Sequence, residues 1–503
     1  MLTTRDQIEH WSTSFKTAPV AARLRGVTRA PFDVFRAAGR PAFILESLAD
    51  GPGQGRFTYL GFAPVQTLTS RDGIARIVGD GPLTGEPGSP TQVLTRALSD
   101  IAGPRVPGLP PFTGGLVGYV GFDGLDGSPV PVPRESRDDE GFSDLDLKLF
   151  DRVVAFDHLT GDIWCLVTIT LDAPDDNYAR AAGVCEELAA LVQHGTPVTP
   201  APLQVYAPFE PLLDSVAFGR AVRTIQDHIR GGNLYQAALS NRLVAPCEGT
   251  LLETYRLLRD TDPCPYMFYL VTDDFEVAGA SLGTLARCVG AQVETCPPGA
   301  SCPRGDATDD EAGLVAALVG DERTLARHAT LLDVACSDVG GISRPGTVEV
   351  DDYLRVRRLP HVLSADTTVR GLMRFGVGPA DVLDALLPSA ALCGAPRDAA
   401  RALLDHWEGV RRGVYGGAVG YVACSGDLDV CAPDRLVSMR GGHVHARASV
   451  VVDAGTAPDP AYDDVVAALH GLVAAIDAPA PGGSFDSGDS APAAPDQREG
   501  DGA

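Results

Sequence analysis

The sequence predicts an α/β protein, and three observations support this fold class. Short apolar or alternating segments typical of strands occur along the whole chain, as at 42–47, 56–61 and 150–171. Longer segments with apolar residues at helical spacing lie between them, as at 177–194 and 321–335. The third observation is a pair of similar glycine-rich segments, GGLVGYVGFD and GGAVGYVACS, which indicates an internal repeat.

The most informative stretch, residues 388–421, predicts a loop, a helix, a glycine turn and a strand in that order. Pro396 fits the first turn of the helix, because the amide hydrogen that proline lacks has no partner there. Gly413 is expected to end the helix, with Arg411 and Arg412 in the last turn near the negative end of the helix dipole. The glycines of the strand that follows predict that another group approaches its backbone closely. From this stretch alone, an ordinary helix-to-strand connection explains the pattern equally well.

Composition narrows the class of protein. The 503 residues carry a formal net charge of −25, and such an acidic surface disfavours binding to nucleic acid or to anionic membranes. No stretch is apolar enough for a membrane helix and the N-terminus lacks a secretory signal, so we expect a cytoplasmic protein. Eleven cysteines at irregular spacing do not predict a disulfide framework.

The chain divides by composition into two halves. We expect an N-terminal half at 1–195, a proline-rich linker at 196–214 and a second half at 215–478. Residues 479–503 are predicted to be a disordered tail, because they contain almost nothing to bury. The two halves are expected to build one large domain.

Five motifs follow one another along the chain: GNLYQAALSNR at 232–242, DPCPYMFY at 262–269, PRG at 303–305, CGAP at 393–396 and RGVYGGAVGY at 412–421. In this order and spacing the chain resembles component I of anthranilate synthase, a chorismate-utilising enzyme, up to about residue 478. The resemblance implies a sandwich of two large antiparallel sheets with surrounding helices. It also implies Mg²⁺ at the chorismate carboxylate, ammonia from a separate glutamine amidotransferase, and feedback inhibition by tryptophan.

The resemblance places a tryptophan-like ligand beside two motifs, one in each half. The family's LES motif corresponds to 45–47 and its NPSPYM motif to 262–267, where Asp262 and Cys264 replace asparagine and serine. The residues implied to bind the allosteric ligand are Glu46, Ser47, Pro265, Tyr266 and Met267. Ordinary roles in a hairpin and in the core are the alternative for these residues.

The residues that would carry the chemistry depart from the family pattern. Arg327 stands where the family has the carboxylate of an AEH motif, and arginine cannot ligate Mg²⁺ because it has no acceptor lone pair. Asp464 corresponds to the C-terminal metal-binding glutamate and is one methylene shorter, which weakens the expectation of Mg²⁺. Ser364 corresponds to the histidine of proton transfer, although serine is a poor general base without a partner. Ser364 and Arg327 are the candidate catalytic residues.

Six residues are implied to bind substrate: Arg435, Arg397, Gly394, Ala395, Arg447 and Tyr421. Arg435 matches a family arginine, although Pro433 and Asp434 replace its neighbours, and Arg397 keeps the charge of a family lysine. Arg327 and Arg447 would place two fixed cations in the site, so we expect a pocket for an anionic ligand without metal. Sequence drift in an inactive site is the alternative.

Four cysteines also replace family residues near the expected site: Cys296, Cys302, Cys336 and Cys393. Cysteines on converging loops could bind Zn²⁺ or an iron–sulfur cluster. The alternative is that each is a small buried residue.

Two functions therefore remain open. The first is an enzyme that acts on chorismate or a related cyclic carboxylate, in aromatic amino-acid or secondary metabolism, with chemistry altered from anthranilate formation. The second is a catalytically inactive paralogue that binds a small anionic ligand or a partner subunit.

Overall fold

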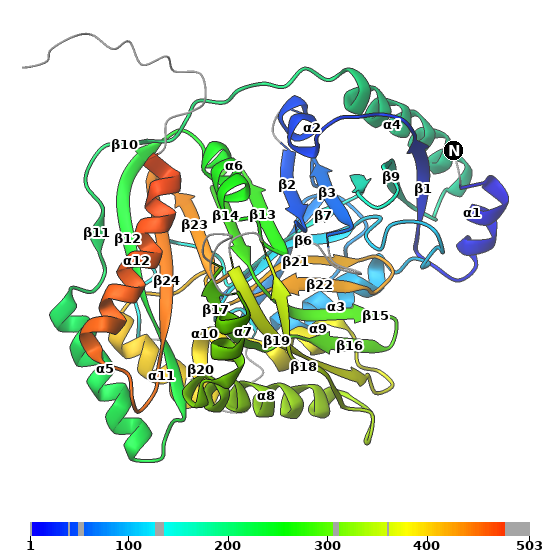
Figure 1. Ribbon diagram of the computed structural model, residues 1–503. Helices are drawn as coiled ribbons and strands as arrows, with labels where there is room; N and C mark the ends of the chain where they lie inside the picture. Colours follow the sequence, from blue (N-terminus) through cyan, green and yellow to red (C-terminus); the bar gives the residue numbers. More distant parts are fainter. Residues whose placement is uncertain are drawn as a thin grey trace, which may run out of the picture.

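The computed structural model describes residues 3–38, 41–48, 55–125, 135–304, 311–359 and 362–477. Two large antiparallel sheets and surrounding helices confirm the fold predicted from the sequence (Figure 1). A core containing Phe43, Tyr59, Tyr119 and Tyr421 draws side chains from strands of both sheets. The predicted disordered tail at 479–503 lies outside the described residues.

The first sheet has 13 strands and contains both halves of the chain. Along the sheet lie β1 (Thr17–Leu24), β9 (Asp162–Thr170), β8 (Arg152–Asp157), β3 (Phe57–Phe62), β2 (Pro41–Glu46), β13 (Tyr266–Val271), β14 (Phe275–Ser281), β23 (Arg435–Arg440), β24 (His443–Val452), β12 (Gln236–Glu248) and β10 (Gln204–Val205). Two short strands, β11 (Glu210–Pro211) and β20 (Gly394–Ala395), also pair with β12. The pairing of β2 with β13 joins the halves within this sheet.

The second sheet has 11 strands and is shared in the same way. Its order is β17 (Pro298–Pro303), β19 (Val362–Leu372), β16 (Gln292–Thr295), β15 (Thr284–Val289), β22 (Leu428–Cys431), β21 (Ala418–Ala423), β6 (Gly115–Val120), β7 (Leu145–Phe150), β4 (Gln66–Arg71) and β5 (Ile74–Val78), and β18 (Glu349–Arg358) also pairs with β19. Because both sheets combine the two halves, the halves form one body. The expected linker at 196–214 includes β10 and β11 beside β12, and the domain boundaries stay sequence predictions.

Helices surround the sheets. They are α1 (Arg5–Ser12), α2 (Pro31–Ala37), α3 (Pro90–Asp100), α4 (Pro174–His194), α5 (Ser215–Arg230), α6 (Leu252–Thr261), α7 (Glu311–Gly320), α8 (Glu322–Ile342), α9 (Pro379–Leu386), α10 (Ala390–Cys393), α11 (Arg397–Glu408) and α12 (Pro458–Asp477). Helices α5, α11 and α12 lie beside β12 and β24, whereas α1 and α4 lie at the other end of the molecule beside β1 (Figure 1). Among the described helices, none is both long and apolar enough to cross a membrane.

The two similar glycine-rich segments form neighbouring strands. Strands β6 and β21 pair antiparallel, with Gly118 opposite Gly420. Both glycines have φ near 150°, at 155° and 152°, a conformation that other residues rarely adopt. A Cβ atom on Gly420 would lie 2.2 Å from the carbonyl oxygen of Asp429 on the next strand. The close approach predicted from the glycines is therefore the approach of neighbouring strands.

The predicted end of the helix within 388–421 was wrong. Helix α11 ends at Glu408, and Gly409 follows in the left-handed conformation with φ 64°. Gly409 is the first glycine after the apolar repeat and supplies the usual C-terminal cap, so the chain leaves the helix before Gly413. Arg411 and Arg412 consequently lie beyond the helix.

A buried ionic network holds this region against the first sheet. The Glu408 carboxylate accepts hydrogen bonds from Nε of Arg412 at 2.8 Å, Nη1 of Arg447 at 3.4 Å and the amide of Ser240 at 2.9 Å. Arg412 also donates to the carbonyl oxygens of Ala238 and Leu392. Burial alone would raise the pKa of Glu408, but the two arginines and the amide together lower it. The carboxylate is therefore ionised at neutral pH.

We predict that Glu408→Gln lowers the free energy of unfolding by about 3–5 kcal/mol, because it leaves the buried Arg412 without its anion and Arg447 with Glu140 alone. Chemical denaturation followed by circular dichroism measures this loss. Asp227→Asn is the control, since Asp227 pairs with Arg230 on the exposed face of α5. A Glu408→Gln protein as stable as the control would contradict the prediction.

Candidate functional site

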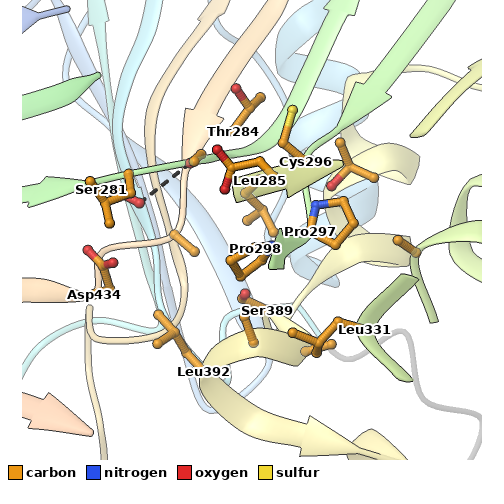
Figure 2. Close-up of a pocket in the computed structure, with 18 of the residues that line it drawn as sticks. Ser281, Thr284, Leu285, Cys296, Pro297, Pro298, Leu331, Ser389, Leu392 and Asp434 are labelled. Carbon is orange, nitrogen blue, oxygen red and sulfur yellow. Dashed lines mark hydrogen bonds between the residues drawn. The ribbon is translucent and has the colours of Figure 1, made fainter. Parts of the chain in front are cut away.

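A cavity of about 230 Å³ opens at one end of the second sheet. Its walls come from the turn between β14 and β15, the segment 295–301, α8, β19, the segment 389–392 and the turn between β22 and β23 (Figure 2). The polar side chains that line it are Ser281, Thr284, Thr295, Ser301, Asp338, Ser364, Asp366, Ser389, Arg397 and Asp434. Leu285, Leu331 and Leu392 add apolar surface, so the cavity suits a small ring with polar substituents.

Two of the predicted catalytic and substrate-binding residues, Ser364 and Arg397, line this cavity. Gly394 and Ala395 form β20, whose backbone pairs with Gln236 and Ala237 on β12, and neither is among the lining residues. The CGAP motif therefore positions Arg397 at the start of α11.

Ser364 has the partner that the sequence interpretation could not supply. Its hydroxyl lies 3.1 Å from Oδ1 of Asp366, two residues further along β19 and on the same face of the strand. Arg357 on β18 donates from Nε to Oδ2 of Asp366 at 2.6 Å. Burial raises the pKa of Asp366, although Arg357 opposes the shift. Ser364, Asp366 and Arg357 thus form a hydrogen-bonded chain that ends at the cavity.

Arg397 is balanced by a carboxylate within the same cavity. Nη1 of Arg397 lies 2.9 Å from Oδ1 of Asp338 on α8, and the second Nη completes a bidentate pair. Burial raises the pKa of Asp338, and Arg397 opposes this rise. The cation that replaces the family lysine is consequently already neutralised before any ligand enters.

Asp434 is a third carboxyl group in the cavity wall. It lies in the turn between β22 and β23, and Figure 2 shows it on the same side of the cavity as Ser281. Its Oδ1 atom is buried and has no hydrogen-bond partner among the described residues. Burial raises the pKa of Asp434 to about 6, and Arg435 only partly offsets this effect.

Three predicted site arginines, Arg327, Arg447 and Arg435, are not among the residues that line the cavity. Nε of Arg327 lies 2.5 Å from Oδ2 of Asp453, at the end of β24. Arg447 is buried and pairs with Glu140 at 3.3 Å and with Glu408. These arginines do not line the cavity, which corrects the expected pair of fixed cations around an anionic ligand. Carboxylates from distant parts of the chain hold them elsewhere.

Arg435 is likewise engaged outside the cavity. Its Nη1 pairs with Oδ2 of Asp262 and lies 3.5 Å from Sγ of Cys264. The residues that replace asparagine and serine in the family's NPSPYM motif are therefore the contacts of Arg435. Its neighbour Asp434, rather than Arg435, lines the cavity.

The residues implied to hold Mg²⁺ do not fit that ion. Arg327 offers no lone pair, and Asp464 is exposed on the outer face of α12. Within the described ranges, no group of three or more histidine, cysteine, aspartate or glutamate side chains is arranged to hold a metal ion. Mg²⁺ usually requires several oxygen ligands in octahedral geometry, which this donor set does not provide.

The same observation corrects the hypothesis of a cysteine-bound metal. Cys296, Cys302, Cys336 and Cys393 all lie in the described part of the chain and do not come together in such a group. Burial raises the pKa of the Cys393 thiol to about 12, so it is a protonated small core residue at neutral pH.

A second cavity, of about 250 Å³, brings together the five residues implied to bind an allosteric ligand. Glu46 and Ser47 come from the end of β2 and Pro265, Tyr266 and Met267 from the start of β13, where Met267 pairs with Glu46. Tyr421 lines this second cavity instead of the first. Side chains alternate along β21, and Tyr421 faces the core between the sheets.

Glu46 has one carboxylate oxygen without a hydrogen-bond partner in the part of the chain that the structure describes. Oε2 of Glu46 accepts hydrogen bonds from the hydroxyl of Tyr255 at 2.6 Å and from Nε of Arg259 at 2.7 Å. Oε1 is buried and unbonded among the described residues. Tyr59, Tyr266 and Tyr421 supply aromatic surface in the same cavity. This combination suits an amine attached to an aromatic group.

The two cavities share a wall residue. Thr284 lines both, and its hydroxyl lies 2.8 Å from the hydroxyl of Tyr266, which also donates to Asp429 at 2.7 Å. A ligand that moves Tyr266 would therefore act on a residue of the first cavity.

The sequence interpretation missed the three aspartates of the first cavity. Asp366 could have been found from its spacing, because residues two apart on a strand share a face with Ser364. Asp434 adjoins a predicted anchor, Arg435, and was considered only as a replaced neighbour. No local signal marks Asp338, whose role follows from its contact with Arg397 across a long sequence separation.

Comparison with known proteins places the chain in a family. A family model described as chorismate binding enzyme matches residues 46–457, and the chain belongs to this family. Anthranilate synthase component 1 of Thermus thermophilus is 32% identical over 462 residues, which cover 91% of this chain and 95% of that protein. Anthranilate synthase component 1 of Pseudomonas aeruginosa is 32% identical over 453 residues, with 86% and 90% covered. The resemblance seen in the motifs is confirmed.

Solved structures have the same fold. Anthranilate synthase component I from Streptococcus pneumoniae matches with a TM-score of 0.69 at 24% identity, covering 84% of this chain and 93% of that chain. The menaquinone-specific isochorismate synthase of Escherichia coli matches with a TM-score of 0.67 at 16% identity, covering 94% and 98%. At these identities the similarity establishes the fold alone.

We predict that Arg327→Gln destabilises the protein more at pH 6 than at pH 3. Burial would raise the pKa of Asp453, but Arg323 and Arg327 hold this pKa well below its usual range. An unfolded aspartate titrates near pH ~4, so the stabilisation is complete above that pH and declines as pH falls toward the lowered pKa.

Denaturant titrations of wild type and variant at the two pH values measure this difference. Arg355→Gln serves as the control, because its pair with Asp352 is exposed. An equal loss of stability at both pH values would contradict the assignment of Asp453 as the partner of Arg327.

Proposed function

We propose that the first cavity binds chorismate or a related cyclic carboxylate and that the protein converts it by chemistry altered from anthranilate formation. The observation that carries this proposal is the Ser364–Asp366 pair, which lies in the cavity. The motif resemblance matches Ser364 with the family's proton-transfer histidine. The anthranilate synthase relatives support a role in tryptophan or related aromatic metabolism.

Asp366 supplies the acid–base group in this proposal. Because burial raises its pKa, Asp366 holds a proton more readily than an exposed aspartate does. Ser364 relays a proton between Asp366 and a hydroxyl or amine of the ligand, and Arg357 stabilises the ionised carboxylate. Hydroxyl groups of Thr284 and Ser389 are further donors for the substituents of the ring.

A second protein belongs to this proposal. The relatives are named as component 1 of a synthase, which supports a separate glutamine amidotransferase that delivers ammonia. Free ammonia at high concentration would replace that partner in an assay of the chain alone.

We predict that Ser364→Ala and Asp366→Asn each lower the turnover of chorismate with ammonia by ~10²-fold or more, the usual size of a general acid–base contribution. If the two residues act as one relay, the double variant loses no more than the worse single variant. Consumption of chorismate measured by absorbance, with products separated by chromatography, gives these rates.

Ser70→Ala is a matched control, because Ser70 is a buried serine on β4 of the same sheet and is not among the residues that line the cavity. Unfolding curves for each variant separate lost catalysis from lost folding. Full activity in Ser364→Ala would contradict the proposed relay.

A second candidate function, a catalytically inactive protein that binds a small anionic ligand or a partner subunit, is favoured by a different observation. At the first position expected to bind metal, Arg327 offers no lone pair and is paired with Asp453. At the second, Asp464 is exposed. Neither residue is therefore arranged to hold a metal ion in the cavity. A wild-type protein that binds chorismate in calorimetry and leaves it unchanged with ammonia would favour this candidate.

We further propose that the second cavity binds a tryptophan-like amino acid that regulates the first. Support comes from the unbonded oxygen of Glu46, which suits an α-ammonium group, and from the tyrosines that suit an aromatic side chain. Thr284 and Tyr266 connect the two cavities.

Glu46→Gln is expected to weaken tryptophan binding by about tenfold or more, because it removes a buried charge-assisted hydrogen bond. Calorimetric titration of tryptophan into both proteins measures the change, and binding of chorismate serves as the internal control. Unchanged tryptophan affinity in the variant would place the amino acid elsewhere.

A further inference from the structure

More acidic than basic side chains line the first cavity. Asp338 is paired with Arg397, and Asp366 with Arg357 and Ser364. Among the described lining residues Arg397 is the one cation, and its charge is already shared with Asp338. The cavity therefore offers an entering ligand more negative than positive charge.

Asp434 has a carboxylate oxygen without a hydrogen bond among the described residues that line the cavity or surround it. The guanidinium next to it in the chain, Arg435, offsets part of its charge but donates its hydrogen bonds to Asp262 and Cys264. Oδ1 of Asp434 is buried and receives no hydrogen bond from the described residues. A buried carboxylate oxygen in this state is costly, and a ligand that donates to the carboxyl group would remove that cost.

The residues around Asp434 indicate which functional groups such a ligand carries. Leu285, Leu331 and Leu392 line the same cavity and suit a ring (Figure 2). Nε of Arg397 has no hydrogen bond among the described residues and is the guanidinium donor left for a carboxylate. A carboxylate group placed against Asp434 would be repelled, whereas an ammonium group would form a charge-assisted hydrogen bond.

We propose that Asp434 is a specificity-determining residue that selects a small cyclic carboxylate bearing a protonated amine, with the amine held against the Asp434 carboxylate. This inference rests on the proposed function, because it assumes that the cavity takes a cyclic carboxylate. It adds the class of substituent that the cavity selects and the residue that selects it. Arg397 and the leucines are the contacts for the remainder of the ligand.

The test compares two probes that differ only in the amine, cis-2-aminocyclohexane-1-carboxylate and cyclohexanecarboxylate. Calorimetric titration of the wild-type protein at pH 7.5 is expected to give about tenfold or more tighter binding of the amino compound. Asp434→Asn keeps the size of the side chain and is expected to bring the two affinities close to equality. Asp434→Ser is a second variant with the same expected result.

Asp463→Asn, an exposed change on α12, is the control and should retain the wild-type preference for the amine. Equal wild-type affinities for the two probes, or an amine preference that survives in both Asp434 variants, would overturn the inference. Binding of chorismate separates failure of this inference from failure of the proposed function. If chorismate binds and the amine brings no gain, the inference alone fails; if neither chorismate nor the probes bind, the proposed function fails as well.

Discussion

Glu408 is a buried carboxylate between two buried arginines, and the wall of the first cavity depends on it. Arg412 connects it to the carbonyl oxygens of Ala238 on β12 and Leu392 on the cavity wall, and Arg447 connects it to β24. Glu140, from the N-terminal half, completes the charge balance of Arg447. Separating any of these buried charges from its partner would cost free energy. The segment 389–397 is therefore held in one position relative to the first sheet.

The pairing of buried charges also explains where the other site arginines expected from the sequence lie. Arginines at sequence positions expected to face a ligand are matched to carboxylates of the chain itself: Arg327 to Asp453 and Arg447 to Glu140 and Glu408. The carboxyl groups that do face the cavity, Asp338, Asp366 and Asp434, have raised pKa values because they are buried. In the proposed function, these carboxyl groups take the place of the expected histidine and metal ligands.

The interpretation from sequence succeeded where the relevant residues are contiguous. The segments with Glu46 and Met267 were recognised as motifs, and they meet because each ends or begins a strand at the β2–β13 pairing. It failed where a side chain's direction or partner mattered. The motif predicts a substrate contact for Tyr421, which faces the second cavity, and a helix end at Gly413, although Gly409 precedes it. Helix caps and strand faces change with a shift of one or a few residues.

By itself the sequence determined the α/β class, the repeated glycine strands and the family, because periodicity, turn residues and ordered motifs are local properties of the chain. The tertiary structure alone decided which charges meet. Asp338 pairs with Arg397 and Asp366 with Arg357 because α8 and β18 pack against these residues. Oδ1 of Asp434, just before β23, has no hydrogen bond among the described residues. Ion-pair partners are chosen by distance and burial in space, and neither quantity is encoded in any short stretch of sequence.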